Sequence, residues 1–546
     1  MKVNPLLQSI NPDTFLIDYL EACGIKEKNI DDFLSPEEYC FDSPWDYPNM
    51  EKAVHLLHSS QDKKIGVLVD SDCDGNMSAA MIVNFLVKSI GITPVVLFHK
   101  GKAHGLRKNI DEDLVTEVIE QGIELLIIPD AGTNDAQECH ELKCHNVNVL
   151  ILDHHEITTE NNDAVIVNHH LGTELNTALS GTGVTHKFIY AYCYKFGLTI
   201  PQYQDMVAIS LISDICDLST LENRAYIELG LKNITNPMIK LMVDKLNRKG
   251  VNPEGCSWGL IPPINSLCRS DNQEGKEVFF NALAGIGDIE KGLYWARKAH
   301  REQTNTVKDM YAEIEPNLDL DHKAIVSFCE PENKSYIGLV ANKILGQYGK
   351  PTILLREMNS TTWTGSVRSP IPLASKINET RLASCQGHQE ACGIFVKKSN
   401  LNKFQNWLDT LDLSVRPAVD VAGIINVDDI TTELCEICDD WKILWGHGVE
   451  SPVFYCKFTV TQPEISIYRK STNTIRVMHN GVSFIKFFCN DTMCSEFENV
   501  DKAEIEMAVK LSVNEFNGYR NPQGEILQYE IHKIEEKEIK SWEDFF

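Results

Sequence analysis

Three aspartates at alternate positions, Asp70, Asp72 and Asp74, stand between two apolar runs of the chain. The run over residues 65–69 predicts a buried strand, and the run over residues 79–87 predicts part of a helix. Aspartates gathered in one place raise each other's pKa values unless a cation lies among them. Carboxylates with a few histidines suit divalent ions such as Mn²⁺ and Mg²⁺. We therefore interpret the triple aspartate as half of a metal site.

Three later segments also end an apolar run on acidic or imidazole side chains. A single aspartate in such a place is usually a helix cap or a turn residue, and that is our expectation for Asp217. The ordered set of four segments is different, because one shared aspartate could bridge two ions, as in sites for phosphoryl displacement. The candidates are Asp130 in "LLIIPDAGTND", Asp153, His154 and His155 in "VLILDHHE", and Asp214 in "VAISLISDICDLS".

The surrounding pattern predicts the elements that would position these residues. Short apolar runs alternate with helical patterns from about residue 62 to residue 170, with helices expected near 77–89, 111–121 and 135–143. This alternation predicts a parallel α/β sheet with helices on both faces. Ligands bind at the carboxyl ends of the strands of such sheets, which is where the candidate residues lie.

Two later regions have other patterns. Residues 293–315 contain neither Gly nor Pro and predict one helix of roughly 35 Å, long enough to link two lobes. Beyond about residue 415, alternating apolar and polar residues predict antiparallel strands, and we expect a five-stranded barrel with a groove for single strands. Candidates for base stacking are Phe454, Tyr455, Phe458 and Tyr468, most of which we expect in the barrel core.

The composition is that of a globular protein with several domains, since 43% of the 546 residues are hydrophobic and 24% are charged. The net charge of −27 argues against a surface that wraps a polyanion, so a nucleic-acid site would have to be a local channel. No apolar run approaches the roughly 20 residues that span a membrane, and we expect no secretory signal. The 17 scattered cysteines predict reduced thiols and a cytoplasmic protein.

The four acidic segments resemble the motifs of the DHH phosphoesterase superfamily, and their details are similar to the RecJ family of single-strand-specific DNA exonucleases. Other segments resemble that family in the same order, so the resemblance covers most of the chain. They are "DFLSPEEYCFDSPWDYPNMEKAV" (32–54), "ALSGTGVTHKF" (178–188), "LENRAYIELGL" (221–231), "PPINSLCR" (262–269), "TGSVRS" (364–369), "GHQEACG" (387–393) and "WGHGVESPVF" (445–454).

This resemblance implies an α/β fold in which a parallel-sheet DHH catalytic domain is joined by a long helix to an α/β domain of the DHHA1 type, followed by a C-terminal β-barrel of the OB type. The implied division is an N-terminal segment at 1–50, the DHH catalytic domain at 51–230, a helical connector at 231–318, the DHHA1-type domain at 319–405 and an OB-like nucleic-acid-binding domain at 406–546.

The resemblance also implies how two divalent ions, Mn²⁺ or Mg²⁺, are held. The implied ligands are Asp70 and Asp72 for one ion, Asp74, His154 and Asp214 for the other, and Asp130 as the bridge. The same pattern implies that His155 faces the scissile phosphate and that Asp153 orients the imidazoles.

Contacts to the DNA follow from the same resemblance. Ser366 and Arg368 resemble contacts to a terminal phosphate, with Arg269 a further candidate, and His388 resembles a histidine that approaches the strand from the second domain. The family usually has a glycine where this chain has Gln386. In "HKGKAHGL" the family tends to have arginine and tyrosine, and here the candidates for phosphate contact are Lys100, Lys102 and His104.

Together these features predict a metal-dependent exonuclease that hydrolyses single-stranded DNA. The resemblance further implies cleavage from the 5′ end, release of mononucleotides, and a role in repair, recombination or replication. A phosphodiesterase for short oligonucleotides or cyclic dinucleotides is an alternative, but a barrel is more than so small a substrate needs. A catalytically silent replication scaffold is another, but the ligand set is complete. Single-stranded DNA and, by resemblance, a single-stranded-DNA-binding protein are the expected partners, and we expect no membrane association.

Overall fold

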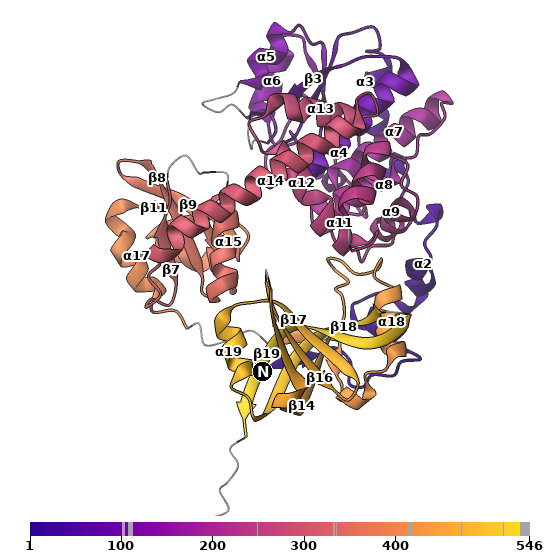
Figure 1. The fold of residues 1–546 in the computed structure, drawn as a ribbon. Coiled ribbons are helices and arrows are strands. Elements are labelled where there is room, and N and C mark those ends of the chain that lie inside the picture. The colour runs from indigo at the N-terminus through magenta and orange to yellow at the C-terminus, as the bar shows by residue number, and fades with distance from the viewer. Residues whose placement is uncertain are drawn as a thin grey trace, which may run out of the picture. The chain divides into compact units, whose positions relative to one another are not determined.

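The chain folds into two compact units, whose elements Figure 1 labels. One unit comprises Asp31–Asp412 with Gly446–Gly448, and the other comprises Met1–Ile30, Leu413–Trp445 and Val449–Phe546. The computed structural model describes residues 1–100, 104–107, 113–247, 249–330, 334, 336–412, 418–470, 472–516 and 518–534.

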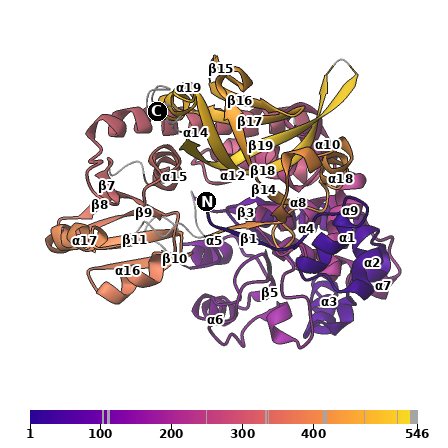
Figure 2. The same cartoon turned by 90° about the horizontal axis from the view of Figure 1, so that it is seen from below.

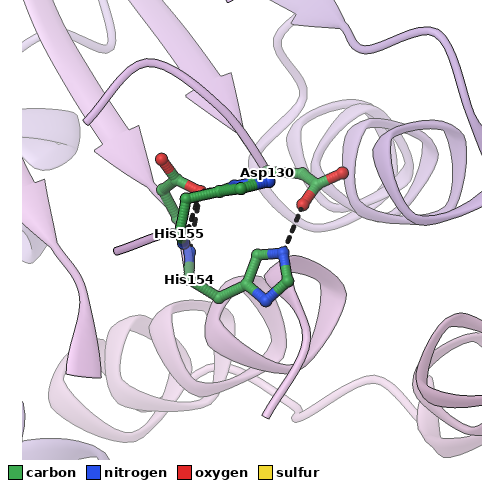
Figure 3. A group of neighbouring side chains, drawn as sticks. Asp130, His154 and His155 are labelled. Carbon is green, nitrogen blue, oxygen red and sulfur yellow. Dashed lines mark hydrogen bonds and ion pairs between the residues drawn. The ribbon is translucent and has the colours of Figure 1, made fainter. Parts of the chain in front are cut away.

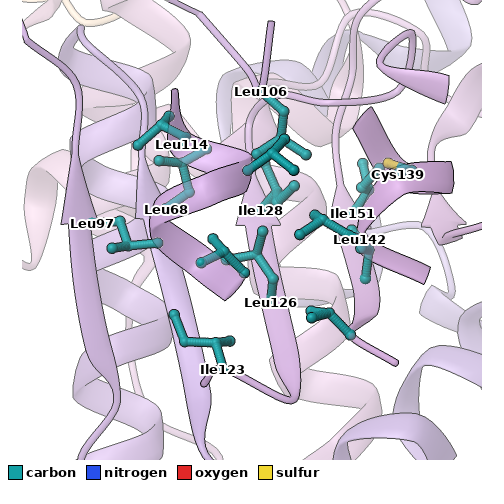
Figure 4. Close-up of a cluster of buried hydrophobic side chains, with 14 of the residues drawn as sticks. Leu68, Leu97, Leu106, Leu114, Ile123, Leu126, Ile128, Cys139, Leu142 and Ile151 are labelled. Atoms are coloured by element: carbon teal, nitrogen blue, oxygen red, sulfur yellow. The ribbon is translucent and has the colours of Figure 1, made fainter. Parts of the chain in front are cut away.

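Five parallel strands form the first sheet of the larger unit, in the order β3-β2-β4-β5-β6. The helices α5 (Leu114–Glu120) and α6 (Ala136–Cys144) pack on this sheet through apolar side chains, among them Leu114 and Leu142, as Figure 4 shows. Each fully buried leucine or isoleucine of such a core contributes about 1.5–3 kcal/mol. The predicted parallel α/β sheet is thus confirmed. The strands are β2 Ile65–Val69, β3 Val95–Phe98, β4 Leu125–Pro129, β5 Asn148–Leu152 and β6 Val165–Val167.

The helix after β2 begins earlier than the sequence pattern predicts. Helix α4 spans Cys73–Phe85 and continues into a π-helical turn at Leu86–Ile90. It starts inside the aspartate motif because Asp72 is its N-cap, with the carboxylate Oδ1 accepting a hydrogen bond of 3.1 Å from the Gly75 N–H. The first turn of α4 therefore holds Asp74 in a fixed position relative to the end of the strand.

The remaining helices of this region complete the DHH-like domain and lead to the next one. The expected long helix is α14, whose 26 residues, Ile289–Ile314, make it about 39 Å long. The others are α2 Ile30–Leu34, α3 Met50–His58, α7 Gly181–Phe196, α8 Gln204–Ser213, α9 Leu221–Lys232, α10 Pro237–Leu246, α11 Pro253–Gly259, α12 Ile261–Cys268 and α13 Gln273–Leu283.

A second, mixed sheet follows α14, with the strand order β10-β11-β9-β8-β7. Its two faces have separate apolar cores, one including Ile353, Val367 and Phe404 and the other including Ile325 and Leu354. The elements are β7 Ile325–Phe328, α15 Ile337–Tyr348, β8 Thr352–Asn359, β9 Thr362–Arg368, α16 Ala374–Thr380, β10 Ala383–Gly387, β11 Ala391–Lys397 and α17 Leu401–Leu408.

The smaller unit is built on a seven-stranded sheet rather than the five strands we expected, in the order β13-β14-β18-β19-β17-β16-β15. Of the aromatic candidates, Phe454 and Phe458 are buried in its core, Tyr455 is partly buried and Tyr468 is exposed. The strands are β13 Gly423–Ile424, β14 Val453–Thr461, β15 Ile465–Arg469, β16 Asn473–His479, β17 Val482–Cys489, β18 Lys502–Phe516 and β19 Tyr519–Lys533, and the helices are α18 Thr432–Asp440 and α19 Asp491–Glu498.

The first thirty residues belong to this smaller unit. Strand β1 (Val3–Pro5), labelled in Figure 2, pairs in parallel with β12 (Val419–Val421). In α1 (Phe15–Ala22) the Phe15 ring lies 5.4 Å from the ring of Phe454, between centroids. The residues predicted as one N-terminal segment, 1–50, are thus divided between the units, and the other predicted boundaries stay predictions. Among the described residues, no helix combines the length and apolarity that crossing a membrane requires.

Candidate metal centre and phosphate contacts

The acidic segments of the larger unit converge at the carboxyl ends of the parallel strands. Asp70 follows β2, Asp130 follows β4, and Asp153, His154 and His155 follow β5. Two groups of side chains place one potential ligand atom each within 4.8 Å of one another. These groups are Asp70, Asp72 and Asp130, and Asp74, His154 and Asp214.

Asp130 belongs to the first group and lies next to His154 of the second. Its backbone has a positive φ of 66°, and its N–H donates to the Leu152 carbonyl at 2.8 Å. The carboxylate Oδ1 lies 3.2 Å from His154 Nε2 (Figure 3) but accepts no well-directed hydrogen bond from the described residues. Burial and then the charges of Asp74 and Asp72 raise the pKa of Asp130 well above its ordinary value. A carboxylate so placed needs a cation to be stable in its ionised form.

Asp74 is held by the first turn of α7. Its Oδ2 accepts from the Gly181 N–H at 2.9 Å, and its Oδ1 accepts from the Thr182 N–H at 2.8 Å and the Ser210 hydroxyl at 2.6 Å. Backbone N–H groups at a helix N-terminus are a favourable partner for an anion. A Cβ atom at position 181 would stand 2.4 Å from Asp130 Oδ1, so only glycine allows α7 to approach both carboxylates.

Asp70 is surrounded by two histidines. His104 Nδ1 lies 2.9 Å from Oδ2 and His99 Nε2 lies 3.5 Å from Oδ1, while the Gly105 N–H donates to Oδ1 at 3.2 Å. Burial by itself would raise the pKa of Asp70, but the hydrogen bonds with His104 and His99 outweigh it and lower the pKa to about 2. The carboxylate is therefore ionised and available as a ligand.

His99 and His104 show what the sequence analysis did and did not find. His104 was predicted to contact phosphate; its Nδ1 lies 2.9 Å from Asp70 Oδ2, and the phosphate contact stays a prediction. His99 was missed, although it directly follows the end of β3, the position at which the other strands carry their functional residues.

Asp72 and Asp214 are the outer ligand candidates of the two groups. Burial and then the charge of Asp70 raise the pKa of Asp72. Burial and then the charge of Asp74 raise the pKa of Asp214 to about 6, and its Oδ2 lies 3.5 Å from His154 Nε2. As expected, Asp217 serves a turn, since its Oδ1 accepts a hydrogen bond of 2.8 Å from the Ser219 N–H.

Asp153 binds both histidines of the pair. Its Oδ1 accepts from the His154 N–H at 2.7 Å and lies 2.8 Å from His155 Nδ1, and its Oδ2 accepts from the Thr133 N–H at 3.1 Å. Although burial disfavours a charged imidazole, the bond with Asp153 outweighs it and raises the pKa of His155 to about 9. His155 is therefore a cation at neutral pH, and its side chain is 43% exposed, so it can face a phosphate group.

The donors in this centre fit two divalent ions. Carboxylate oxygens predominate, one imidazole joins them, and Asp130 Oδ1 has no hydrogen-bond donor in the described part of the chain. Carboxylate-rich sets with imidazole suit Mn²⁺ and Mg²⁺, and a bound cation would remove the repulsion that raises the pKa values of Asp72, Asp130 and Asp214.

Arg269 is the predicted phosphate contact that the structure brings to this centre. It follows α12, and its buried Nε atom has no hydrogen-bond partner in the described structure. Its charge also lowers the pKa of Asp72, though less than burial and Asp70 raise it. A guanidinium with an unmet donor beside a metal site suits a phosphate oxygen. Lys100 is exposed at the end of β3, and Lys102 lies outside the described residues.

Ser366 and Arg368 form a second site, on β9 of the mixed sheet. Arg368 Nη1 donates to the Ser366 hydroxyl at 2.6 Å and to the Val367 carbonyl at 2.8 Å. Gly338, in the first turn of α15, is so near that a Cβ atom there would stand 2.5 Å from Arg368 Nη2. A guanidinium beside the N-terminus of a helix is a natural place for an anion.

His388 lies in the tight connection between β10 and β11. Its N–H donates to the Ala391 carbonyl at 3.1 Å, and the side chain is exposed. Gly387 before it has a positive φ of 125°, which favours glycine, and Gln386 is an exposed residue paired with Gly393. The contact of His388 with a DNA strand stays a prediction.

Comparison with known proteins finds family models that match two parts of the chain. Residues 64–211 match the model of the DHH family, N-terminal domain, and residues 421–528 match that of the RecJ OB domain. The crystal structure of RecJ in complex with Mn²⁺ from Thermus thermophilus has a TM-score of 0.73 at 20% identity, covering 97% of this chain and 78% of that one. The same protein with Mg²⁺ has a TM-score of 0.68 at 19% identity, covering 98% and 78%.

Two relatives from Bacillus subtilis (strain 168) are also similar in sequence. A protein described as a putative SPbeta prophage-derived single-strand DNA-specific exonuclease, YorK, is 26% identical, with 90% of this chain and 92% of that protein covered. The single-stranded-DNA-specific exonuclease RecJ is 24% identical, with 94% and 67% covered.

The fold and the acidic rim are similar to those of the DHH family, whose N-terminal domain model matches residues 64–211. The chain is also similar to RecJ, because the RecJ OB domain model matches residues 421–528 and the fold is like that of RecJ.

Proposed function

We propose that this protein is a metal-dependent exonuclease that hydrolyses single-stranded DNA from the 5′ end and releases mononucleotides. The observation that carries the proposal is the pair of ligand groups on one rim, in which Asp130 of one group lies 3.2 Å from His154 of the other. Relatives described as single-strand DNA-specific exonucleases support the choice of substrate. The OB domain supports a polymeric strand over a dinucleotide, since such domains bind several nucleotides in a groove.

The two ions would be held by the six side chains that the sequence analysis named as ligands. Two divalent ions bound there would help to activate a water molecule and to stabilise charge on the attacking and leaving oxygens. The hydrogen bonds from Gly181, Thr182 and Ser210 fix Asp74, so the ligand geometry exists before the substrate arrives.

The side chains around the metal centre would bind and orient the phosphodiester. His155, kept protonated by Asp153, would donate a proton or a hydrogen bond to an oxygen of the scissile phosphate. Arg269 would hold a neighbouring phosphate through its unpartnered Nε. Both interactions stabilise negative charge where it increases during hydrolysis.

The polarity would come from the second site. Ser366 and Arg368, next to the first turn of α15, offer a hydroxyl, a guanidinium and helix N–H groups to a terminal phosphate dianion. A phosphate at the 5′ end would then determine which end of the strand is cut first. His388 and Lys100 are proposed as weaker contacts to the strand, and a single-stranded-DNA-binding protein as a partner in the cytoplasm.

A time course on single strands labelled at the 5′ or the 3′ end tests the proposal. With Mn²⁺ we expect 5′ label to appear at once as mononucleotide, 3′ label to shorten progressively, and a chelator to stop both. A blunt duplex should be cut far more slowly. Degradation from the 3′ end would refute the polarity, and rapid cleavage of a dinucleotide with none of the long strand would refute the exonuclease.

A further inference from the structure

A cavity of about 570 Å³ lies in the larger unit between residues 38–45, α7 and residues 200–204. It contains none of the candidate metal ligands or phosphate contacts. Its buried lining includes His186, Lys187 and Tyr226, while Trp45 and Tyr194 line it with exposed rings. We call it the aromatic pocket.

The aromatic side chains of this pocket are exposed although they are large and apolar. Tyr194 is 67% exposed, Trp45 is 39% exposed and Tyr190 is 38% exposed. Tyr190 and Tyr194 are four residues apart on α7 and so share one face of that helix. Trp45 is held by a short 3₁₀ helix, Pro44–Asp46, whose N-cap Ser43 accepts a hydrogen bond from the Trp45 N–H. Exposed aromatic rings gathered around a cavity mark a binding site for another molecule.

The charge of the pocket selects the kind of molecule. Glu38 and Asp42 line it, and the residues from 31 to 46 include six acidic side chains and no lysine or arginine. Among the described residues of its lining, Lys187 is the only lysine or arginine, and this buried ammonium pairs with Glu222 and donates to the Asp42 carbonyl at 2.5 Å. A phosphate-bearing ligand would therefore meet net negative charge, whereas a cation would be attracted.

His186 adds a polar group with an unmet hydrogen bond. Its Nδ1 lies 2.9 Å from the Tyr226 hydroxyl, while its buried Nε2 has no hydrogen-bond partner in the described structure. Burial, and then the charge of Lys187, lower the pKa of His186 to about 3, so the ring is neutral at ordinary pH. When Nδ1 carries the proton and donates it to Tyr226, Nε2 is an acceptor, and a buried group of this kind gains from a donor supplied by a ligand.

We propose that the aromatic pocket binds an arginine side chain from a basic segment of a partner protein. A guanidinium is planar, stacks on aromatic faces and is only weakly hydrated, so it suits a pocket lined by rings such as Trp45 and Tyr194. Its charge complements Glu38 and Asp42, and its N–H groups suit an acceptor such as His186 Nε2 in the same lining. A lysine ammonium has the same charge but cannot stack in this way.

The probe for this proposal is a capped peptide of Gly-Arg-Ser repeats, compared with Gly-Lys-Ser and Gly-Glu-Ser peptides of equal length. Calorimetry at physiological salt gives the affinities, and quenching of Trp45 fluorescence, measured against Trp45→Phe, reports on the site. We expect the arginine peptide to bind about tenfold more tightly than the lysine peptide and the acidic peptide not to bind.

Matched variants distinguish binding of the arginine peptide in the pocket from a general attraction of basic peptides to an acidic protein. Asp42→Asn should weaken binding of the arginine peptide several-fold. Asp46→Asn, the same change at an exposed residue outside the lining, should leave the affinity unchanged. Tyr194→Ala should weaken binding of this peptide as well. Tyr39→Ala, at an exposed tyrosine that is not part of the lining, should leave the affinity unchanged. Asp42→Asn preserves side-chain shape, so the test stands even if Tyr194→Ala fails to fold.

Equal losses with Asp42→Asn and Asp46→Asn, or equal affinities of the arginine and lysine peptides, would overturn the proposal. Loss of affinity for a single-stranded oligonucleotide in Tyr194→Ala, with the peptide unaffected, would assign the pocket to nucleic acid and overturn it too. All variants should keep the wild-type exonuclease rate, because none of these residues belongs to the proposed active site.

Discussion

The metal centre and the Arg368 site are opposite in charge and in how they are built. The metal centre gathers carboxylates around Asp130, whose Oδ1 has no hydrogen-bond donor among the described residues, and therefore favours a cation. The Arg368 site places a guanidinium against the first turn of α15, and therefore favours an anion. A DNA strand with bound divalent ions would supply both the cation and the anion. The two sites are therefore complementary to the same substrate, as expected for one phosphodiesterase.

The two sites also differ in rigidity. Asp74 accepts hydrogen bonds from two backbone N–H groups and from the hydroxyls of Thr182 and Ser210, so its position is strongly determined. Among the described residues, Arg368 donates to a hydroxyl and a carbonyl of its own strand, and its long side chain can adjust to a ligand. We therefore expect changes at the metal centre to abolish chemistry and changes at the Arg368 site to alter the choice of strand end.

The largest effect is expected for Asp130→Ala. Removing the shared carboxylate separates the two ligand groups, and hydrolysis should fall at least about 10³-fold, the scale of several kcal/mol of charge stabilisation. The measurement is single-strand degradation at saturating Mn²⁺, with circular dichroism to show that the fold is intact. Asp217→Ala, which removes a nearby turn carboxylate, is the control and should retain activity. Normal turnover by Asp130→Ala would exclude the bridging role.

A smaller, more selective effect is expected for Arg368→Ala. Loss of one charged hydrogen bond to phosphate costs about 1.5–3 kcal/mol, so the preference for 5′-phosphorylated over 5′-hydroxyl strands should fall about 10- to 150-fold. Arg368→Lys should restore only part of it, because a lysine cannot bind phosphate through two parallel hydrogen bonds. The measurement is the ratio of the degradation rates of 5′-phosphorylated and 5′-hydroxyl strands at a fixed salt concentration.

The control for Arg368 is Arg356→Ala, since Arg356 lies on the neighbouring strand β8 and its replacement removes the same charge from the same sheet. Metal binding should be unchanged in all three variants. The assignment of the 5′-phosphate site would be wrong if the wild type made no distinction between the two kinds of end.

Gly338→Ala refines the same comparison with a still smaller change. The added methyl group would stand 2.5 Å from Arg368 Nη2, and the flexible guanidinium would move away from the first turn of α15. The 5′-phosphate preference should therefore weaken by less than in Arg368→Ala, through KM rather than kcat. Gly346→Ala, in the same helix with no atom near its Cβ position, is the control. An unchanged KM in Gly338→Ala would show that helix and guanidinium do not act together.

The smallest effect concerns stability and pH. The pKa of Asp214 is about 6 in the folded protein and 3.8 in its ordinary state, so the folded, metal-free protein binds more protons between these values. Its stability therefore falls as the pH rises through that window, and the carboxylate repulsion is fully present above it. Mn²⁺ should raise the thermal midpoint a few degrees more at about pH 7.5 than at about pH 5. An equal shift at both values would mean that these carboxylates do not bind the ion.

Much of the fold could be predicted because its signals are local. The runs that became β2, β4 and β5 are continuous, apolar and short, and each ends on a functional side chain, so strand, helix and site could be placed together. The number of strands in the C-terminal sheet could not be predicted, because short alternating runs do not reveal which strand edges pair. The assignment of Met1–Ile30 to that unit depends on the pairing of β1 with β12, more than 400 residues away in the chain.

The sequence by itself determined the ligand types, their order and the elements that carry them, because side-chain chemistry and hydrophobic periodicity are properties of neighbouring residues. Only the tertiary structure decided that His99 and His104 stand against Asp70, that the first turn of α7 holds Asp74, and that Gly338 lies beside Arg368. These contacts join residues from different elements, and distances of a few ångströms between such elements depend on packing. The same holds for the aromatic pocket, whose lining joins residues about 150 positions apart, from Trp45 to Tyr194.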